Sequence, residues 1–293
     1  MKQFTDKTEH YTLGLYEKAM PGRLSLREKL LAARRSGYDF VELSIDETPE
    51  KLARLESGSG ERMDIIRNMH DTGIAFRSMC LSGHRRYPLG SSDKETEARG
   101  MEIMREAIGL ADDLGIRIIQ LAGYDVYYEA GTEDTRKRFA DNICKSVEMA
   151  ASYGIVLGFE TMETDFMNTV QKAMDYVRMA DSSFLTVYPD LGNITNAAKV
   201  LGVGVEDDIR SGKGHLCAMH LKETKPGVFR EVPFGKGHVD FENGIRIAWD
   251  CGIRRYVTEF WDVGKADWEE DLERAVRMMR GILDRQQKDA GRP

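Results

Sequence analysis

The stretch Gly154–Glu160, GIVLGFE, combines a glycine, an apolar run and a terminal carboxylate. A glycine placed before such a run suits the left-handed conformation in which helices often end. The apolar residues that follow suit a strand buried on both faces, as in a parallel sheet. The same glycine-to-strand step occurs at Gly37, Gly73, Gly115, Gly154, Gly214 and Gly252. The chain is therefore built from repeating units of a helix followed by a strand.

Eight apolar runs predict strands, at Thr12–Tyr16, Phe40–Ser44, Ala75–Cys80, Arg117–Leu121, Ile155–Glu160, Phe184–Tyr188, Leu216–Leu221 and Arg255–Glu259. Between them, apolar residues recur three and four positions apart, as in amphipathic helices. We predict helices at Leu26–Arg35, Met63–Thr72, Glu95–Leu114, Asp134–Tyr153, Thr169–Met179, Phe241–Asp250 and Trp268–Arg285. Strands this apolar fit a closed barrel better than an open sheet, and no linker-like tract divides the chain. The sequence therefore predicts a single (β/α)8 TIM barrel domain over residues 1–293.

The composition is that of an ordinary globular protein. The chain has 293 residues, of which 41% are hydrophobic and 31% are charged, and its net charge is −7. A negative charge disfavours a nucleic-acid partner, because phosphate backbones attract basic surfaces. The four cysteines are isolated, which is typical of reduced thiols, and no apolar run reaches the ~20 residues of a membrane span. We therefore expect a cytoplasmic protein with neither a nucleic-acid nor a membrane partner.

Four predicted strands end at side chains that can bind a metal. At the ends of strands five to eight lie Glu160, Asp190, His220 and Glu259. Each alone has an ordinary alternative role as a helix cap or a solvated loop residue, but the C-terminal ends of barrel strands meet at one mouth. Carboxylates suit Mg²⁺ and Mn²⁺, and an imidazole adds Zn²⁺, Co²⁺ or Fe²⁺ to the choice. We therefore predict a site for one divalent cation, whose identity these residue types do not decide.

Glu160 and Glu259 end strands five and eight, so they can approach a bound sugar from opposite sides. A cation that chelates a ketose carbonyl and the neighbouring hydroxyl oxygen acidifies the carbon between them and stabilises the resulting enediolate. One carboxylate then removes the proton and the other returns it. Return to the same carbon from the opposite face gives an epimer, whereas transfer between carbons gives an aldose–ketose isomer. The two glutamates therefore predict a proton transfer, and the product is either an epimer or an isomer.

Further polar residues follow strands three, four and seven, where a barrel gathers its substrate contacts. These candidates are His84, Arg85, Arg86, Gln120, Tyr124, Lys222 and Lys236. The basic ones could bind sugar hydroxyls or a phosphate. Lys222 is expected to point into the mouth, because it lies two residues after His220 on a strand. The alternatives are a solvated loop for His84–Arg86 and a plain glycine turn around Lys236.

Seven stretches at or just beyond the predicted strand ends carry a family resemblance. They are YDFVELSIDE (Tyr38–Glu47), RSMCLSGHRRYPLGS (Arg77–Ser91), QLAGYDVYYE (Gln120–Glu129), GFETMETDFMN (Gly158–Asn168), YPDLGN (Tyr188–Asn193), MHLKETKPGVFREVPFGKGHVDF (Met219–Phe241) and TEFW (Thr258–Trp261). Through them the chain resembles the L-ribulose-5-phosphate 3-epimerases, also described as L-xylulose-5-phosphate 3-epimerases, in the xylose-isomerase-like barrel superfamily. Because they run through nearly the whole chain, they are more specific than one short motif.

The resemblance implies a 3-epimerase that interconverts L-xylulose 5-phosphate and L-ribulose 5-phosphate. It also implies one divalent cation, Mn²⁺, Zn²⁺, Mg²⁺ or Co²⁺, on the four residues named above, with Glu160 and Glu259 as the acid and base. A homodimer is implied as well, with Trp261 or the helix that begins at Trp268 as candidate contacts. Free-ketose 3-epimerases often carry histidine three positions after the metal-binding aspartate. This chain has Asn193 there, which we count among the candidate substrate contacts.

Three other functions fit parts of the pattern. A ketose-phosphate isomerase, such as a hexulose-6-phosphate isomerase, would use the same four residues and move the proton to another carbon. A metal-dependent endonuclease of the same superfamily would need further histidine ligands and a basic face, which the six histidines and the charge of −7 do not supply. A noncatalytic sugar-phosphate sensor would not need the second glutamate. The epimerase is therefore the favoured function, with the isomerase as the alternative.

Overall fold

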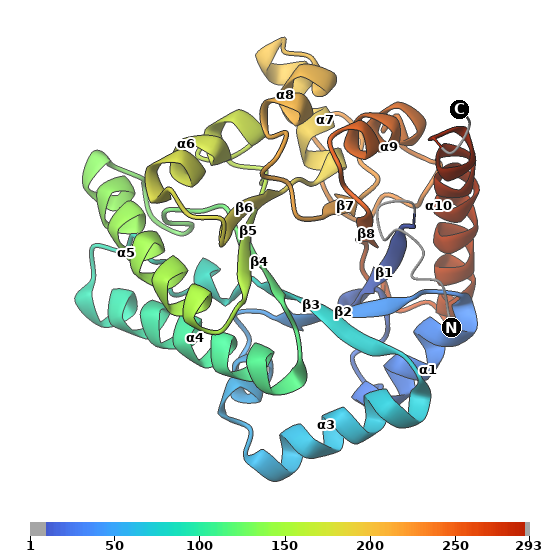
Figure 1. The fold of residues 1–293 in the computed structure, drawn as a ribbon, viewed down its shortest axis with the longest axis horizontal. Helices are drawn as coiled ribbons and strands as arrows, with labels where there is room; N and C mark the ends of the chain where they lie inside the picture. Colours follow the sequence, from blue (N-terminus) through green and yellow to red (C-terminus); the bar gives the residue numbers. More distant parts are fainter. Residues whose placement is uncertain (1–9, 291–293) are drawn as a thin grey trace, which may run out of the picture.

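A computed structural model of the protein describes residues 10–290. The strands in this range are β1 (Thr12–Tyr16), β2 (Phe40–Ile45), β3 (Ala75–Leu81), β4 (Ile118–Ala122), β5 (Val156–Glu160), β6 (Leu185–Tyr188), β7 (Met219–Leu221) and β8 (Arg255–Thr258). They pair in parallel in the order β6-β5-β4-β3-β2-β1-β8-β7. The isolated bridges Val187–Leu216 and Asp190–His220 join β6 to β7 and bring the two edges of the sheet together (Figure 1). The predicted (β/α)8 TIM barrel is confirmed. The prediction of a single domain over residues 1–293 includes chain ends outside the described range, so it stays a prediction.

Helices surround the strands on the outside of the barrel (Figure 1). The α-helices are α1 (Leu26–Ser36), α2 (Pro49–Leu52), α3 (Ser59–Thr72), α4 (Lys94–Leu114), α5 (Glu133–Ser152), α6 (Val170–Ala180), α7 (Leu191–Leu201), α8 (Val205–Ser211), α9 (Phe241–Asp250) and α10 (Trp268–Ala290). Short 3-10 turns lie at η1 (Glu17–Ala19), η2 (Ala53–Glu56) and η3 (Gly83–Arg85). Within residues 10–290, no helix has both the length and the hydropathy of a membrane span.

The glycines that precede the strands have the backbone conformation that the sequence predicts. All six adopt a positive φ, between 65° for Gly154 and 94° for Gly252. Only glycine enters this left-handed region without steric cost, so each glycine reverses the chain from a helix into the next strand. These turns therefore connect helices to strands in the repeating units of the barrel.

The sequence does not reveal α7 and α8, which lie between β6 and β7. Helix α7 begins directly after Asp190, whose Oδ1 accepts the backbone N–H of Asn193 at 2.7 Å and caps the helix. The helices predicted from the sequence do not include this segment, in which Gly192 and the asparagines of LGNITNAAKVL are poor helix formers. Asp190 therefore has two roles, since one carboxylate oxygen caps α7 and the other faces the barrel mouth.

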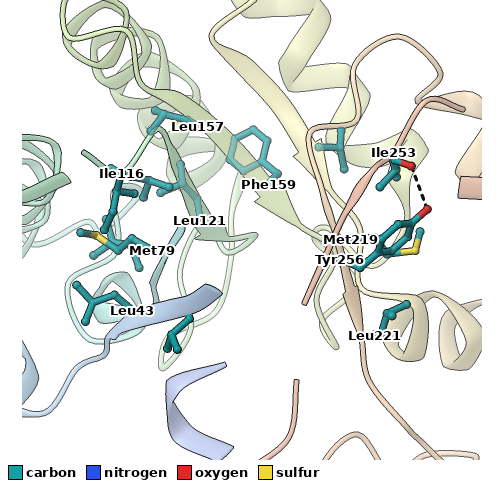
Figure 2. Packing of buried hydrophobic residues seen from close by; sticks show 14 of the residues in the cluster. Leu43, Met79, Ile116, Leu121, Leu157, Phe159, Met219, Leu221, Ile253 and Tyr256 are labelled. Atoms are coloured by element: carbon teal, nitrogen blue, oxygen red, sulfur yellow. Dashed lines mark hydrogen bonds between the residues drawn. The ribbon is translucent and has the colours of Figure 1, made fainter. Parts of the chain in front are cut away.

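The main hydrophobic core lies between the barrel and its helices. Outward-facing strand residues, including Leu43, Leu121, Phe159, Leu221 and Tyr256, pack together in this layer (Figure 2). Burying a side chain of this size stabilises the fold by about 1.5–3 kcal/mol. This apolar layer holds the strands in register and therefore fixes where their C-terminal ends lie.

Residues that face the barrel interior are apolar low in the barrel and polar at its mouth. Phe40 fills the lower interior with Tyr188 and Val257, and a Cβ added at Gly14 would lie 2.4 Å from the Phe40 ring. Because side chains alternate along a strand, the residue two positions later faces the same interior. Such pairs are Phe40/Glu42, Ile118/Gln120, Gly158/Glu160, Tyr188/Asp190, Ala218/His220 and Val257/Glu259. The alternation of side chains along the strands thus places polar side chains together at the C-terminal end of the barrel.

Candidate metal centre and catalytic site

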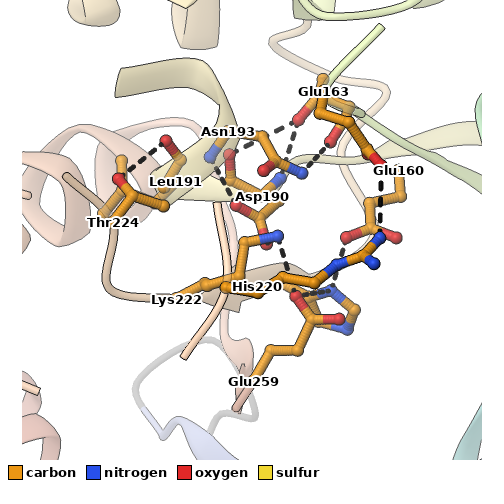
Figure 3. A network of polar contacts seen from close by, with 12 residues as sticks. Glu160, Glu163, Asp190, Leu191, Asn193, His220, Lys222, Thr224 and Glu259 are labelled. Carbon is orange, nitrogen blue, oxygen red and sulfur yellow. Dashed lines mark hydrogen bonds and ion pairs between the residues drawn. The ribbon is translucent and has the colours of Figure 1, made fainter. Parts of the chain in front are cut away.

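The four predicted metal ligands meet at the C-terminal mouth of the barrel (Figure 3). Glu160 is the last residue of β5, His220 lies in β7, and Glu259 directly follows β8. Asp190 lies shortly after β6, at the start of α7. One potential ligand atom from each side chain lies within 4.8 Å of the other three, and all four residues are buried. Four consecutive strands therefore assemble the cluster that the sequence predicts.

The cluster contains more acceptor atoms than nearby donors can satisfy. His220 Nδ1 lies 3.1 Å from Glu160 Oε1 and 3.7 Å from Glu259 Oε2. Lys222 Nζ lies 3.0 Å from Asp190 Oδ2 and 3.2 Å from Glu259 Oε2. Among the described residues, however, neither of these two buried oxygens accepts a hydrogen bond. Buried polar atoms without such a partner are rare and point to a further ligand.

These residues fit a single divalent cation. Three carboxylates and one imidazole are a donor set that Mn²⁺, Zn²⁺, Mg²⁺ and Co²⁺ can all accept. Bonds from zinc to oxygen or nitrogen are about 2.0–2.2 Å long, so two ligands on one ion lie at most about 4.4 Å apart. The observed spread of 4.8 Å is close to that limit. A cation would also bind Asp190 Oδ2 and Glu259 Oε2, which have only ion pairs with Lys222 and, for Glu259, with His220. Which cation binds stays a prediction.

The buried carboxylates differ in how readily they ionise. Burial raises the pKa of Asp190 to about 8; Lys222 opposes this shift and Glu259 reinforces it. Burial and the charge of Glu259 raise the pKa of Glu160 as well. Burial alone would also raise the pKa of Glu259, but Lys222 and His220 lower it to about 2. Because the carboxylates repel one another, bound protons or a cation would stabilise the cluster in addition to Lys222.

A fifth buried residue, Glu42 of β2, orients the histidine. His220 Nε2 lies 2.6 Å from Glu42 Oε1, while Glu42 Oε2 accepts hydrogen bonds from Ser78 Oγ at 2.7 Å and Tyr188 OH at 2.9 Å. Glu42 has no exposed surface. Its bond to Nε2–H turns Nδ1 toward Glu160 and Glu259, which is the usual way that a carboxylate orients a metal-binding histidine. We did not predict this role, although a glutamate inside an apolar strand was a signal for it.

We expect Glu42→Gln to weaken Mn²⁺ binding about 10- to 100-fold. The neutral amide cannot raise the basicity of His220 as the carboxylate does, and its NH2 group would face the hydroxyl groups of Ser78 or Tyr188. Titration of free Mn²⁺ by electron paramagnetic resonance measures the affinity directly. The exposed Glu50, changed to Gln, is the matched control. Equal affinity in the Glu42 variant and the control would show that Glu42 does not support the metal ligand.

Three of the predicted substrate contacts lie in or beside the cluster. Lys222 is buried between Asp190 and Glu259 (Figure 3). Gln120 is buried and donates a hydrogen bond from Nε2 to Glu160. Asn193 donates from Nδ2 to the Thr161 carbonyl at 2.7 Å, and its buried Oδ1 accepts no hydrogen bond from the described residues. All three can therefore position a ligand or a catalytic carboxylate.

The structure does not bring the other three predicted contacts to the cluster. His84 is buried and donates from Nε2 to the Gly100 carbonyl at 3.1 Å, and burial lowers its pKa to about 4. Arg86 is exposed, with its guanidinium carbon 5.6 Å from the centre of the Tyr87 ring. Lys236 is exposed in the loop after β7. The His84 side chain therefore makes a buried hydrogen bond to α4, and the side chains of Arg86 and Lys236 face solvent.

A cavity of about 130 Å³ opens beside the cluster. Glu160, Lys222 and Glu259 form part of its wall. The rest includes residues that follow β1, β3 and β5 and the loop after β7, with both aromatic and basic side chains. The two glutamates that the sequence predicts as acid and base therefore line the same cavity.

Known proteins resemble the chain over almost its full length. The family model described as xylose isomerase-like TIM barrel matches residues 30–282. L-ribulose-5-phosphate 3-epimerase UlaE of Escherichia coli O157:H7 is 43% identical over 266 residues, which cover 90% of this chain and 92% of that protein. The chain belongs to the L-ribulose-5-phosphate 3-epimerase family. It is accordingly an isomerase of the epimerase class, and the resemblance drawn from the seven sequence stretches is confirmed.

Further relatives agree with this assignment. The enzyme of the same name from Shigella flexneri is 43% identical over 274 residues, covering 92% of this chain and 94% of its own. A solved L-ribulose 3-epimerase superposes with a TM-score of 0.79 at 18% identity, covering 97% of this chain and all of that one. D-psicose 3-epimerase of Clostridium cellulolyticum H10, solved with D-tagatose, gives a TM-score of 0.76 at 15% identity and covers 93% of this chain and 99% of its own. These two structures share the fold of this epimerase.

Proposed function

We propose that the protein interconverts L-xylulose 5-phosphate and L-ribulose 5-phosphate by inverting the configuration at C3. The observation that carries the proposal is the pair of buried glutamates, Glu160 and Glu259, placed around His220 at one cavity. Relatives that are 43% identical bear the name L-ribulose-5-phosphate 3-epimerase, which supports the substrate. A cytoplasmic location and a homodimer stay predictions.

The two glutamates supply the proton transfer. A divalent cation held by the four clustered residues would polarise the C2 carbonyl, acidify the C3 proton and stabilise the enediolate charge. Either Glu160 or Glu259 removes that proton, and the other carboxyl group protonates C3 from the opposite face. Gln120 donates to Glu160 and Lys222 lies 3.2 Å from Glu259, so each glutamate has its own orienting partner. The reverse reaction exchanges the roles of the two glutamates.

We expect the Mn²⁺-loaded protein to convert L-xylulose 5-phosphate into L-ribulose 5-phosphate in D2O, with deuterium incorporated at C3. Protonation comes from a carboxyl group that exchanges with solvent, so the product carries the label at the inverted carbon. Nuclear magnetic resonance gives both the identity of the product and the position of the label. Label at C1 together with an aldose would instead identify an isomerase. If no carbon of the sugar incorporates deuterium, the proposed function is wrong.

A further inference from the structure

The loop after β7 forms one wall of the cavity beside the cluster. It spans residues 222–240, all of which the structure describes, and it contains no helix or strand, only the isolated bridge Lys225–Val228. Phe229 and Arg230 of this loop line the cavity. A connection this long without regular structure is uncommon in a compact domain and is usually functional. Contacts other than a backbone ladder must therefore hold its shape.

Glu223 connects the two ends of this loop. It is the second residue after β7, and its side chain is buried. Its Oε2 accepts the backbone N–H of Gly235 at 3.0 Å, and its Oε1 accepts those of Val239 and Thr224, both at 3.2 Å. Hydrogen bonds from N–H groups to a carboxylate are stronger than those between neutral groups. The carboxylate therefore faces the loop and holds its far end beside β7.

The chain passes so close to Glu223 that only glycine fits at position 237. A Cβ added at Gly237 would lie 2.1 Å from Glu223 Oε1 and 2.1 Å from the Thr224 carbonyl oxygen. The same carbonyl accepts the backbone N–H of His238 at 3.0 Å, and Thr224 Oγ1 lies 3.1 Å from His238 Nε2. We call Glu223, Thr224 and residues 235–239 the loop clamp, because together they close the base of the loop.

The part of the loop beyond the clamp makes weaker contacts. Arg230 Nη2 lies 3.2 Å from Glu163 Oε1, and the Arg230 guanidinium carbon lies 5.6 Å from the centre of the Trp261 ring. The Arg230 side chain is 43% exposed, so this ion pair contributes little stability. Phe234 packs edge-on against Phe260, with ring centroids 5.7 Å apart. The clamp is therefore the buried polar contact that fixes where the cavity-lining residues of the loop lie.

We propose that Glu223 is a positioning residue for substrate binding, which keeps this wall of the cavity preformed for the ketose phosphate by clamping the loop. The proposal rests on the proposed epimerase function and adds a residue whose carboxylate faces the loop. A wall that is already ordered loses less conformational entropy when the substrate binds. Loss of the clamp should therefore weaken substrate binding and leave the proton transfer by the two glutamates of the cluster intact.

The test compares KM with kcat in two variants that break the clamp in different ways. In Glu223→Gln the amide keeps one acceptor oxygen, but its NH2 group faces a backbone N–H. In Gly237→Ala the carboxylate stays, but the new methyl group collides with it. With Mn²⁺ bound, each variant is expected to raise KM for L-ribulose 5-phosphate about tenfold and to keep kcat within about twofold of wild type, because only substrate binding loses free energy.

Hydrogen exchange of backbone amides measures the clamp directly. Without substrate, the amides of Gly235 and Val239 should exchange faster in both variants than in wild type, because the carboxylate no longer holds them. Saturating L-ribulose 5-phosphate should restore their protection in the variants, since binding then orders the wall, and should change it little in wild type. Unchanged exchange of these two amides in both variants would show that Glu223 does not hold the loop.

Controls separate the role of Glu223 from the proposed function. Glu148→Gln, at an exposed position of α5, should match wild type in KM, kcat and amide exchange. Thermal unfolding and Mn²⁺ affinity show whether each clamp variant is folded and loaded. A wild-type protein that epimerises neither ketopentose phosphate removes the proposed function and the positioning role with it. If the wild type is active but both clamp variants keep its KM, or lose kcat at an unchanged KM, the role of Glu223 alone is overturned.

Discussion

Glu160→Gln and Glu259→Gln should each reduce interconversion of the two epimers by about 10⁴-fold, the upper range for losing a general acid or base. Glutamine keeps the shape of the side chain and one carbonyl oxygen, but it cannot accept and return a proton. Both positions are buried beside His220, so bulk water is poorly placed to replace the missing group. The loss should therefore persist when the variants are saturated with Mn²⁺.

The two variants should also differ in a way that simple misfolding cannot produce. Each retains one glutamate, which can still exchange the C3 proton on its own face of the sugar. We expect one variant to exchange deuterium only into L-xylulose 5-phosphate and the other only into L-ribulose 5-phosphate. Following the C3 signal of each pure epimer in D2O tests this complementary pattern.

The exposed Glu270 on α10, changed to Gln, is the control for these two variants and should behave as wild type. The Mn²⁺ affinity of each variant is measured first, because both glutamates are also candidate metal ligands. Interconversion at the wild-type rate in either saturated variant would contradict the two-carboxylate mechanism.

The four clustered residues could be predicted because each lies where an apolar strand ends. The parallel strands of a barrel bring such ends together, so position along the chain was enough to place Glu160, Asp190, His220 and Glu259 at one mouth. Glu42 required more information. It lies in the middle of β2, and only the paired geometry of β2 and β7 across the barrel shows that it reaches His220.

The turn after β3 shows a different limit of sequence reasoning. His84, Arg85 and Arg86 are adjacent in the chain, and all three are plausible substrate contacts. The η3 turn sends the first into the protein interior, the second to the cavity and the third to solvent. The alternation of a strand no longer applies in a 3-10 turn, so sequence spacing could not decide among them. Only the three-dimensional path of the turn does.

Removal of divalent cations is expected to abolish epimerisation, and binding of Mn²⁺ is expected to release protons. Burial, reinforced by Glu259 and opposed by Lys222, raises the pKa of Asp190 to about 8. Burial alone would lower the pKa of His220, but Glu42, Glu259 and Glu160 raise it well above its ordinary value. At neutral pH these groups therefore hold protons that a cation must displace before their lone pairs can bind it.

The direction of the pH effect on metal affinity follows from the raised pKa values. A ligand with a raised pKa is protonated below that pKa, so Mn²⁺ affinity should increase with pH through the range up to about 8, near the pKa of Asp190. The increase should be about tenfold per pH unit for each proton released. Calorimetric titration at about pH 6.5 and about pH 8.5, on either side of the pKa of Asp190, in buffers with different ionisation enthalpies, measures the affinity and the proton release together. Equal affinities with no proton release would show that the cluster is already deprotonated and that Lys222, rather than bound protons, balances its carboxylates.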